Sequence, residues 1–144
     1  MLTMQADHRK AEIIREAHRI LKKGGLYAIH ELGLTPDSLG EAVKAEIQKK
    51  LAQTIQVNAR PLTEVEWKIL LEKEGFEVMN VFTNSMSLLE TKRVIDDEGF
   101  WRSLRIAFNI LIYPAARKRI LAMRSVFRRY SGHMTGIVII ARKI

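Results

Sequence analysis

The chain has 144 residues, of which 47% are hydrophobic and 28% are charged. This length suits a single domain or part of one, and this balance is typical of globular proteins and not of disordered or fibrous ones. The sequence contains no cysteine, which excludes disulfides, cysteine zinc sites and cysteine nucleophiles. Residues 1–8 lack the pattern of a secretory signal, and we expect a cytoplasmic protein.

The formal net charge of +8 is concentrated in the last third of the chain. Residues 1–91 carry 12 Lys and Arg against 13 Asp and Glu, whereas residues 92–144 carry 12 against 3. A positive field of this kind attracts anions to that part of the surface. The most apolar stretch, residues 106–116, is about half the ~20 residues that a membrane-spanning helix needs.

The first predicted elements are an amphipathic helix over residues 7–22 and a strand over residues 26–32. Apolar side chains recur along the helix at three- and four-residue spacing, and Asp7 is a suitable N-cap. Gly24 or Gly25 is suited to end the helix in the left-handed conformation. The strand is short and mostly apolar, which indicates that it is largely covered on both faces.

Two further helices are predicted next. Thr35 as N-cap and Pro36 at the first helical position favour a helix over residues 36–57. Thr63 and Glu66 form the pattern of a capping box, which begins a third helix that runs to about Glu74.

The second half of the chain contains two predicted strands separated by a helical segment. Residues 76–82 and 136–141 are rich in apolar and β-branched side chains and read as strands. Residues 88–132 read as two or three helices, and Pro114 should break the longest of them because proline removes a hydrogen-bond donor.

Two segments, RILKKGG over residues 19–25 and EGFEV over residues 74–78, resemble motifs of class I, Rossmann-like S-adenosylmethionine-dependent methyltransferases of type 11. In that family the helix after the fourth strand ends in arginine-x-leucine-lysine-proline-glycine-glycine. Residues 19–25, RILKKGG, depart from this run only at Lys23, where proline is usual. Residues 74–78, EGFEV, resemble the entry to the family's sixth strand.

The resemblance implies an α/β fold with a partial Rossmann-like methyltransferase sheet that holds the last three strands. Residues 1–144 are expected to form one partial methyltransferase domain. It also contains flanking helices and, before the final strand, a lid-like helical insertion over residues 88–132. The family's glycine-rich turn and acidic cofactor ligand have no counterpart in this sequence. We therefore expect the C-terminal half of a methyltransferase for a small molecule. S-adenosylmethionine is the cofactor of the complete enzyme, and we expect this chain alone to be inactive and not to bind it.

The resemblance also suggests site residues. Ligands of open α/β sheets bind beyond the carboxyl ends of strands. Thr3 and Gln5 are implied near the cofactor, and Glu31 and His30 near the substrate. Each is read equally well as a solvated polar residue at a strand end. No catalytic residue is indicated, because methyl transfer chiefly requires orientation of the reactants. The four histidines lack the spacing of metal ligands, and we expect no metal site.

Two expectations concern partners. The strand over residues 26–32 lacks the neighbour that it has in a complete family member, and a bare edge favours association. We expect a homodimer, or a separate N-terminal cofactor-binding half.

The basic helical insertion leaves three readings open. It is a lid packed on the sheet, a site for an acidic substrate or nucleic acid, or a surface for an anionic membrane. The alternative function is accordingly a non-catalytic interaction module whose basic amphipathic helices bind a polyanion or a membrane.

Overall fold

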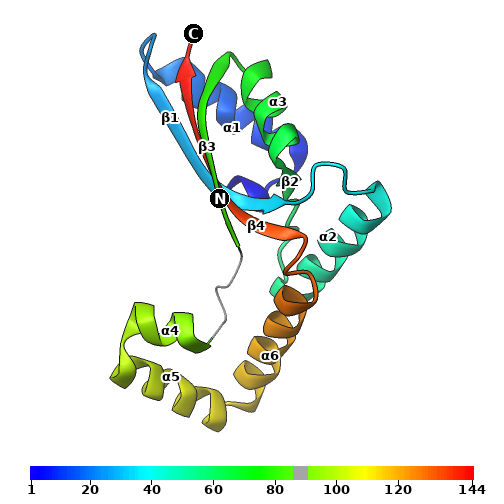
Figure 1. Ribbon diagram of the computed structural model, residues 1–144, viewed down its shortest axis with the longest axis vertical. Helices are drawn as coiled ribbons and strands as arrows, with labels where there is room; N and C mark the ends of the chain where they lie inside the picture. Colours follow the sequence, from blue (N-terminus) through cyan, green and yellow to red (C-terminus); the bar gives the residue numbers. More distant parts are fainter. Residues whose placement is uncertain (86–90) are drawn as a thin grey trace.

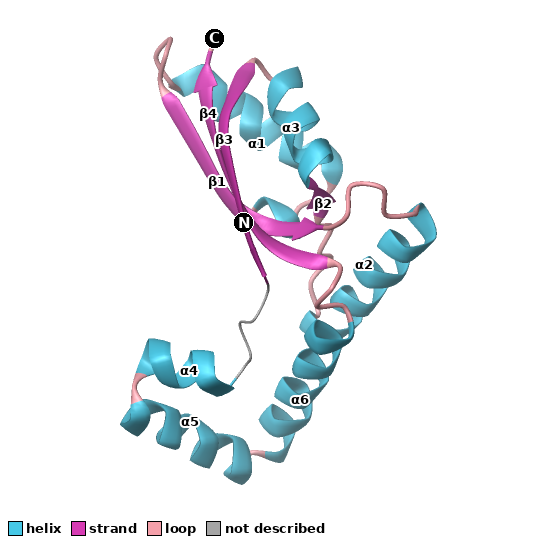
Figure 2. Cartoon of the chain, viewed as in Figure 1, coloured by secondary structure: helices cyan, strands magenta, loops and turns pink. Residues whose placement is uncertain are grey.

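The computed structural model describes residues 1–85 and 91–144 and has a mixed α/β architecture, as the sequence predicts (Figures 1 and 2). In chain order its elements are the 3-10 helix η1 (Leu2–Met4), α1 (Asp7–Ile20), β1 (Leu26–Leu34), α2 (Glu41–Ile55), β2 (Leu62–Thr63), α3 (Glu64–Lys73), β3 (Phe76–Ser85), α4 (Thr91–Glu98), α5 (Phe100–Ile112), α6 (Pro114–Arg129) and β4 (Met134–Lys143).

The described strands form one sheet in the order β2-β1-β4-β3. β1 and β4 pair antiparallel from Leu26 opposite Arg142 to Leu34 opposite Met134, and β3 pairs antiparallel with the other edge of β4. β2 adds only two residues, parallel to the end of β1. The prediction of three strands missed β2, because a two-residue strand has no alternation of its own to detect.

Two hydrophobic cores hold the fold together. In the first, α1 and α3 cover one face of the sheet, and Ile14, Trp67 and Ile139 are completely buried there (Figure 2). In the second, Leu51 of α2 packs with Tyr130, which follows α6. The first core therefore fixes the sheet, and the second attaches α2 and α6 to the end of the sheet.

The opposite face of the sheet is partly uncovered in the described part of the chain. Ala28 and His30 of β1 are exposed, and the Phe82 side chain of β3 is 57% exposed. His30 and Phe82 both pair with Val138 of β4, which places them on the same face. This face and the interior of the first core lie on opposite sides of the same strands.

The outer edge of β1 is also open. β2 pairs with β1 only at Gly33 and Leu34, so residues 26–32 have a strand neighbour on one side only among the residues that the structure describes. An open edge presents unpaired backbone groups to any further strand.

The N-cap predicted for the first helix and the start predicted for the second helix are wrong. Ala6 is the N-cap of α1, and Asp7 instead accepts a hydrogen bond of 2.8 Å from Lys10 Nζ. α2 begins at Glu41 and not at residue 36, because Pro36 belongs to a turn in which its carbonyl accepts from the Leu39 amide. The capping box of α3 is confirmed: Thr63 Oγ1 accepts from the Glu66 amide, and the Glu66 carboxylate accepts from the Thr63 amide.

The ends of α1 and α2 also differ from the predictions. α1 ends at Ile20 with Leu21 extended, so the two glycines lie in the turn that leads to β1 and do not cap the helix. α2 ends at Ile55, before the left-handed Gln56.

The segment between β3 and β4 is helical, as predicted, and α4, α5 and α6 lie in its described part. Pro114 is the first residue of α6, so it separates α5 from α6 as expected. α6 packs against α2, whereas α4 and α5 form an arm beyond the carboxyl ends of β1 and β3 (Figure 1). Residues 88–90 of the predicted insertion lie outside the described residues.

Candidate functional site

A pocket lies where β1 and β3 end and β4 begins, and we call it the strand-end pocket. Its lining is mostly polar and comprises Leu34, Thr35, Asp37, Glu64, Thr83, Asn84, Ser85, Ser131, Met134 and Thr135. Several of these groups are already engaged: Asp37 Oδ1 accepts from the Val65 amide at 3.1 Å, and Thr135 Oγ1 donates to the Asn84 carbonyl at 2.7 Å. The pocket has the position expected for a ligand site in an open α/β sheet.

A groove follows the open edge of β1, and we call it the β1 groove. It is lined by Met1, Leu2, Gln5, Ile13, Tyr27, Ala28, Ile29, His30 and Glu31. Its lining combines apolar side chains of η1, α1 and β1 with an unpaired strand edge. Burial and the negative charge of Glu31 raise the pKa of Tyr27, which is one of the lining residues. An apolar groove beside an unpaired strand edge is suited to bind a further polypeptide segment.

Glu31 fastens the N-terminal segment to β1. Its buried carboxylate accepts from the Leu2 amide at 2.6 Å, from the Thr3 amide at 2.9 Å and from Thr3 Oγ1 at 2.7 Å. The Thr3 hydroxyl in turn accepts from the Leu32 amide, and the Thr3 carbonyl accepts from the Arg60 amide. Three hydrogen bonds to one carboxylate hold residues 2–3 in a fixed position.

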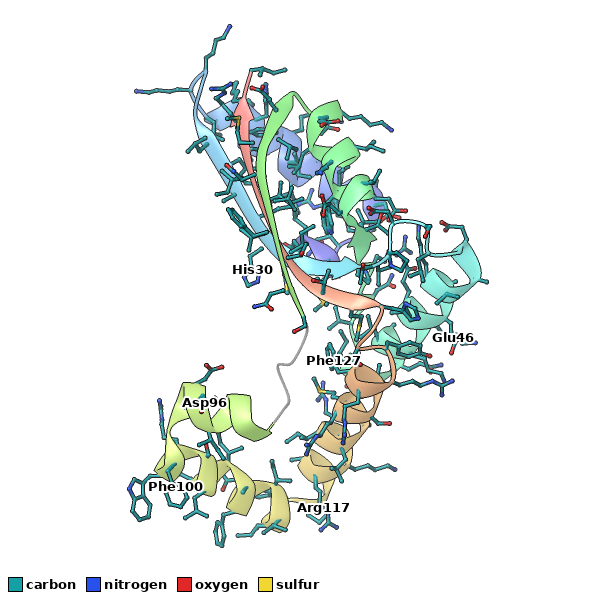
Figure 3. All side chains as sticks on the ribbon, in the orientation of Figure 1. His30, Glu46, Asp96, Phe100, Arg117 and Phe127 are labelled. Atoms are coloured by element: carbon teal, nitrogen blue, oxygen red, sulfur yellow. The ribbon has the colours of Figure 1, made fainter. Side chains whose placement is uncertain are left out.

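The structure brings three of the four predicted site residues to the β1 groove. Gln5, His30 and Glu31 line it, and Thr3 lies beside it, completely buried. His30 is exposed and projects on the side of the sheet opposite α1 and α3 (Figure 3). The roles of Thr3 and Gln5 toward a cofactor, and of Glu31 and His30 toward a substrate, stay predictions.

Thr3, which the resemblance implies near the cofactor, is already engaged within the chain. The polar groups of Thr3 are engaged with Glu31, Leu32 and Arg60. No glycine-rich turn between a strand and a helix N-terminus occurs among the residues that the structure describes. The expectation that this chain alone does not bind S-adenosylmethionine stays a prediction.

Sequence reasoning missed Asp37 and Thr135 as lining residues of the strand-end pocket. Asp37 was assigned to the interior of a helix that in fact begins four residues later, at Glu41. Had Pro36 been read as part of a turn after β1, Asp37 would have been placed beyond a strand end. Asn84 and Ser85, which also line the pocket, are the last two residues of β3, because this strand runs beyond the predicted end at residue 82.

The arm formed by α4 and α5 does not pack on the sheet. No residue of α5 is buried, and the reading of the insertion as a lid stays a prediction. α6 is held more firmly, because the Tyr130 hydroxyl donates to Glu46 Oε1 at 2.5 Å across to α2. This hydrogen bond to Glu46, together with burial, raises the pKa of Tyr130.

In residues 1–85 and 91–144, no three His, Asp or Glu side chains are grouped so as to hold a metal ion. Nor does the described chain contain a helix with the length and apolar character needed to cross a membrane.

The sheet order, the flanking helices and the helical insertion define a class: this chain has the fold of Rossmann-like S-adenosylmethionine-dependent methyltransferases. Phosphoethanolamine N-methyltransferase 2 of Haemonchus contortus, solved with S-adenosylmethionine, matches 99% of this chain with a TM-score of 0.64 and 15% identity. A methyltransferase of Geobacter sulfurreducens, solved with S-adenosylhomocysteine, matches 93% with a TM-score of 0.58 and 14% identity.

A third solved structure with this fold is not described as a methyltransferase. The [4+2]-cyclase SpnF matches 99% of this chain with a TM-score of 0.64 and 18% identity. One fold therefore carries more than one chemistry, and the fold alone does not establish the activity.

This chain spans only part of each of these proteins. It covers 31% of the Haemonchus enzyme, 52% of the Geobacter enzyme and 46% of SpnF. A Haemophilus influenzae protein described as uncharacterized is 32% identical over 111 residues, which are 77% of this chain and 42% of that protein. No family model matches the sequence.

Proposed function

We propose that this chain supplies the C-terminal half of an S-adenosylmethionine-dependent methyltransferase that acts on a small molecule in the cytoplasm. In this proposal the cofactor-binding half comes from additional polypeptide, in the same or a separate chain, and this chain alone is inactive. The observation that carries the proposal is the open edge of β1 beside the β1 groove. A strand added there would continue the sheet.

The uncovered sheet face supports the same proposal. Ala28, His30 and Phe82 are exposed on one face, whereas the other face is covered by α1 and α3. A sheet with one face on a core and one apolar face in water is less stable than one covered on both. Helices of a second half would cover this face and complete the layers of an α/β domain.

The substrate is proposed to enter the strand-end pocket. Its polar lining residues, among them Asp37 and Thr135, suit a small polar molecule more than an apolar one. Because the described residues do not complete a cofactor site, no catalytic role is assigned to any of them.

Calorimetry with S-adenosylmethionine tests the proposal. The chain of 144 residues should give no micromolar binding, because it lacks the donors for the cofactor. Co-expression with the part of the Haemophilus influenzae protein outside the matched stretch should yield a complex that binds the cofactor. Micromolar binding to the chain alone would refute the need for a second half.

The alternative function is a non-catalytic interaction module. It is favoured by one observation, the exposed apolar helix α5 beside the basic helix α6. Binding of a polyanion or a membrane by α5 and α6 of the chain, together with no cofactor binding in the co-expressed complex, would favour this alternative.

A further inference from the structure

Helix α5 exposes large apolar side chains. Trp101 is 79% exposed, Leu111 67%, Phe100 63% and Phe108 60%. A shallow, almost wholly apolar groove on this helix is lined by Trp101, Leu104, Arg105, Ala107, Phe108 and Leu111. Contiguous exposed apolar surface of this kind marks an interaction site or a membrane contact.

Three polar side chains of α5 lie along one stripe of the helix, and Arg105 of this stripe borders the apolar groove. Arg102, Arg105 and Asn109 follow one another at spacings of three and four residues, which places them along one stripe. Long arginine side chains beside an apolar face can keep their charges in water while their stems contact the apolar phase. The helix is therefore amphipathic, with its apolar side outward.

The charge of this region has one sign. Residues 100–129 contain eight Lys and Arg and no Asp or Glu. Arg117, Lys118 and Arg119 are exposed near the start of α6. In Figure 3, Phe100 and Arg117 both lie at the end of the molecule away from the sheet, near opposite ends of α5.

We infer that α5 and the first half of α6 bind the surface of an anionic phospholipid membrane, with α5 lying in the plane of the interface. A helix of 13 residues is about 20 Å long, too short to span the ~30 Å hydrocarbon core but suited to lie at its boundary. Trp101 and Tyr113 stand at its two ends, and aromatic residues of this kind favour the headgroup region. This inference does not depend on the proposed methyl transfer.

Two other occupants fit less well. A second copy placed symmetrically on this face would bring two strongly positive regions together, with only Asp96, Asp97 and Glu98 of the neighbouring α4 as acidic groups beside it. A nucleic acid would engage the arginines but would leave the Trp101, Phe108 and Leu111 side chains in water. An anionic lipid surface matches the charge and covers the apolar side at once.

Vesicle sedimentation of the chain tests the inference. Neutral vesicles of phosphatidylcholine are compared with vesicles that contain about 30 mol% phosphatidylglycerol. The chain should bind the anionic vesicles at least about tenfold more tightly, and the difference should shrink between about 50 and 500 mM NaCl because salt screens the attraction. Trp101 fluorescence should shift to shorter wavelength on binding, whereas Trp67 is already buried.

Two double variants separate the apolar from the electrostatic contribution. Trp101→Ser with Phe108→Ser should weaken binding to all vesicles by at least about tenfold. Its matched control is Val65→Ser with Ile69→Ser, which removes two exposed apolar side chains of α3 and should leave binding unchanged.

Arg117→Glu with Lys118→Glu should abolish the preference for anionic vesicles. Lys49→Glu with Lys50→Glu on the exposed side of α2 makes the same change of charge elsewhere and should reduce that preference much less. Circular dichroism confirms that each variant is folded.

Equal binding to neutral and anionic vesicles would overturn the inference, and so would no binding at low salt. A dimer that Trp101→Ser with Phe108→Ser dissociates, without vesicle binding, would assign α5 to a second copy. Binding to DNA that the apolar double variant leaves unchanged, again without vesicle binding, would assign the basic surface to nucleic acid. Either result would contradict the inference that α5 and α6 bind a membrane.

Discussion

Glu31 determines where the N-terminal segment lies. Its carboxylate accepts three hydrogen bonds from residues 2–3, and its side chain is buried. Glu31→Gln replaces one of the two accepting carboxylate oxygens with an NH2 group, which cannot accept a hydrogen bond. At least one buried donor of residues 2–3 therefore loses its partner. We expect unfolding in urea to require about 1–3 kcal/mol less free energy, with faster amide hydrogen exchange at residues 2–5.

Glu77→Gln is the matched control for Glu31→Gln. Glu77 pairs with Arg142 at 2.7 Å on an exposed edge of the sheet. Exposed ion pairs contribute about 0–1 kcal/mol, so the control should unfold nearly as the unchanged protein does. Equal losses in both variants would contradict an anchoring role of Glu31.

The Lys44–Glu66 pair predicts a dependence of stability on pH. Burial raises the pKa of Glu66, but the hydrogen bonds from Lys44 and from the Thr63 backbone lower it by a larger amount. The net pKa of Glu66 therefore lies below 4.5. Hydrogen bonds to Glu66 and Glu41 raise the pKa of Lys44 above 10.5, although burial opposes this. The charged pair is 2.7 Å apart and joins α2 to the capping box of α3.

The sign follows from these two directions. The lowered pKa of Glu66 contributes stability that is present above pH 4.5 and is lost as the pH falls through the folded value. The raised pKa of Lys44 contributes stability that is present below pH 10.5 and is lost as the pH rises through its folded value. The difference in unfolding free energy between the protein and Glu66→Gln should therefore be constant near neutrality and decrease in acid. A difference that grows on acidification would contradict this assignment.

The capping box of α3 was predictable because its signal is local. Thr63 and Glu66 are three residues apart and need no tertiary contact to recognise each other. Thr63→Ala should lower the free energy of unfolding by about 1–2 kcal/mol, whereas Thr63→Ser should retain most of it. Thr54→Ala, in the interior of α2, removes a hydroxyl that only donates to the Lys50 carbonyl and should have little effect. If Thr54→Ala lowered the free energy of unfolding as much as Thr63→Ala does, the cap would make no specific contribution to stability.

The turn after α3 requires glycine for two reasons. Gly75 has φ +88°, and a Cβ atom built there would lie 2.7 Å from His18 Nε2. Gly24 has φ +78° but open space around it, so Gly24→Ala should cost about 1 kcal/mol from the backbone alone. Gly75→Ala should cost more by about 1 kcal/mol or more because His18 must also move.

A double-mutant cycle with His18→Ala isolates the steric part of this cost. If His18 is the obstacle, Gly75→Ala should be less harmful in the His18→Ala background. His18 also contacts the Phe76 ring edge-on, and its own substitution is therefore measured separately. Equal costs at Gly75 in both backgrounds would leave only the backbone conformation as the cause.

Features that depend on distant contacts could not be predicted from the sequence. The start of α2 was wrong because the Thr35 amide bonds to the His133 carbonyl, almost one hundred residues away along the chain, which keeps this stretch out of the helix. The helical periodicity of α5 was detected, but the sequence left open what its apolar side contacts. A periodic pattern reports that a helix has an apolar side, not what covers it. The α/β class and the order of the long elements were predicted because each has its own periodicity and end signals.

The open edge of β1 and the uncovered sheet face predict how the whole chain associates. In the absence of a second half, we expect concentration-dependent dimers through these two surfaces. Ala28→Glu with Phe82→Glu places charges on the exposed face without touching the first core, and it should raise the dissociation constant of the dimer about tenfold or more in light scattering. Val65→Glu with Ile69→Glu, on the exposed side of α3, makes the same change outside this face and should leave the dimer intact. A protein that stays monomeric at high concentration and melts in a single sharp transition would contradict the prediction that these two surfaces cause association.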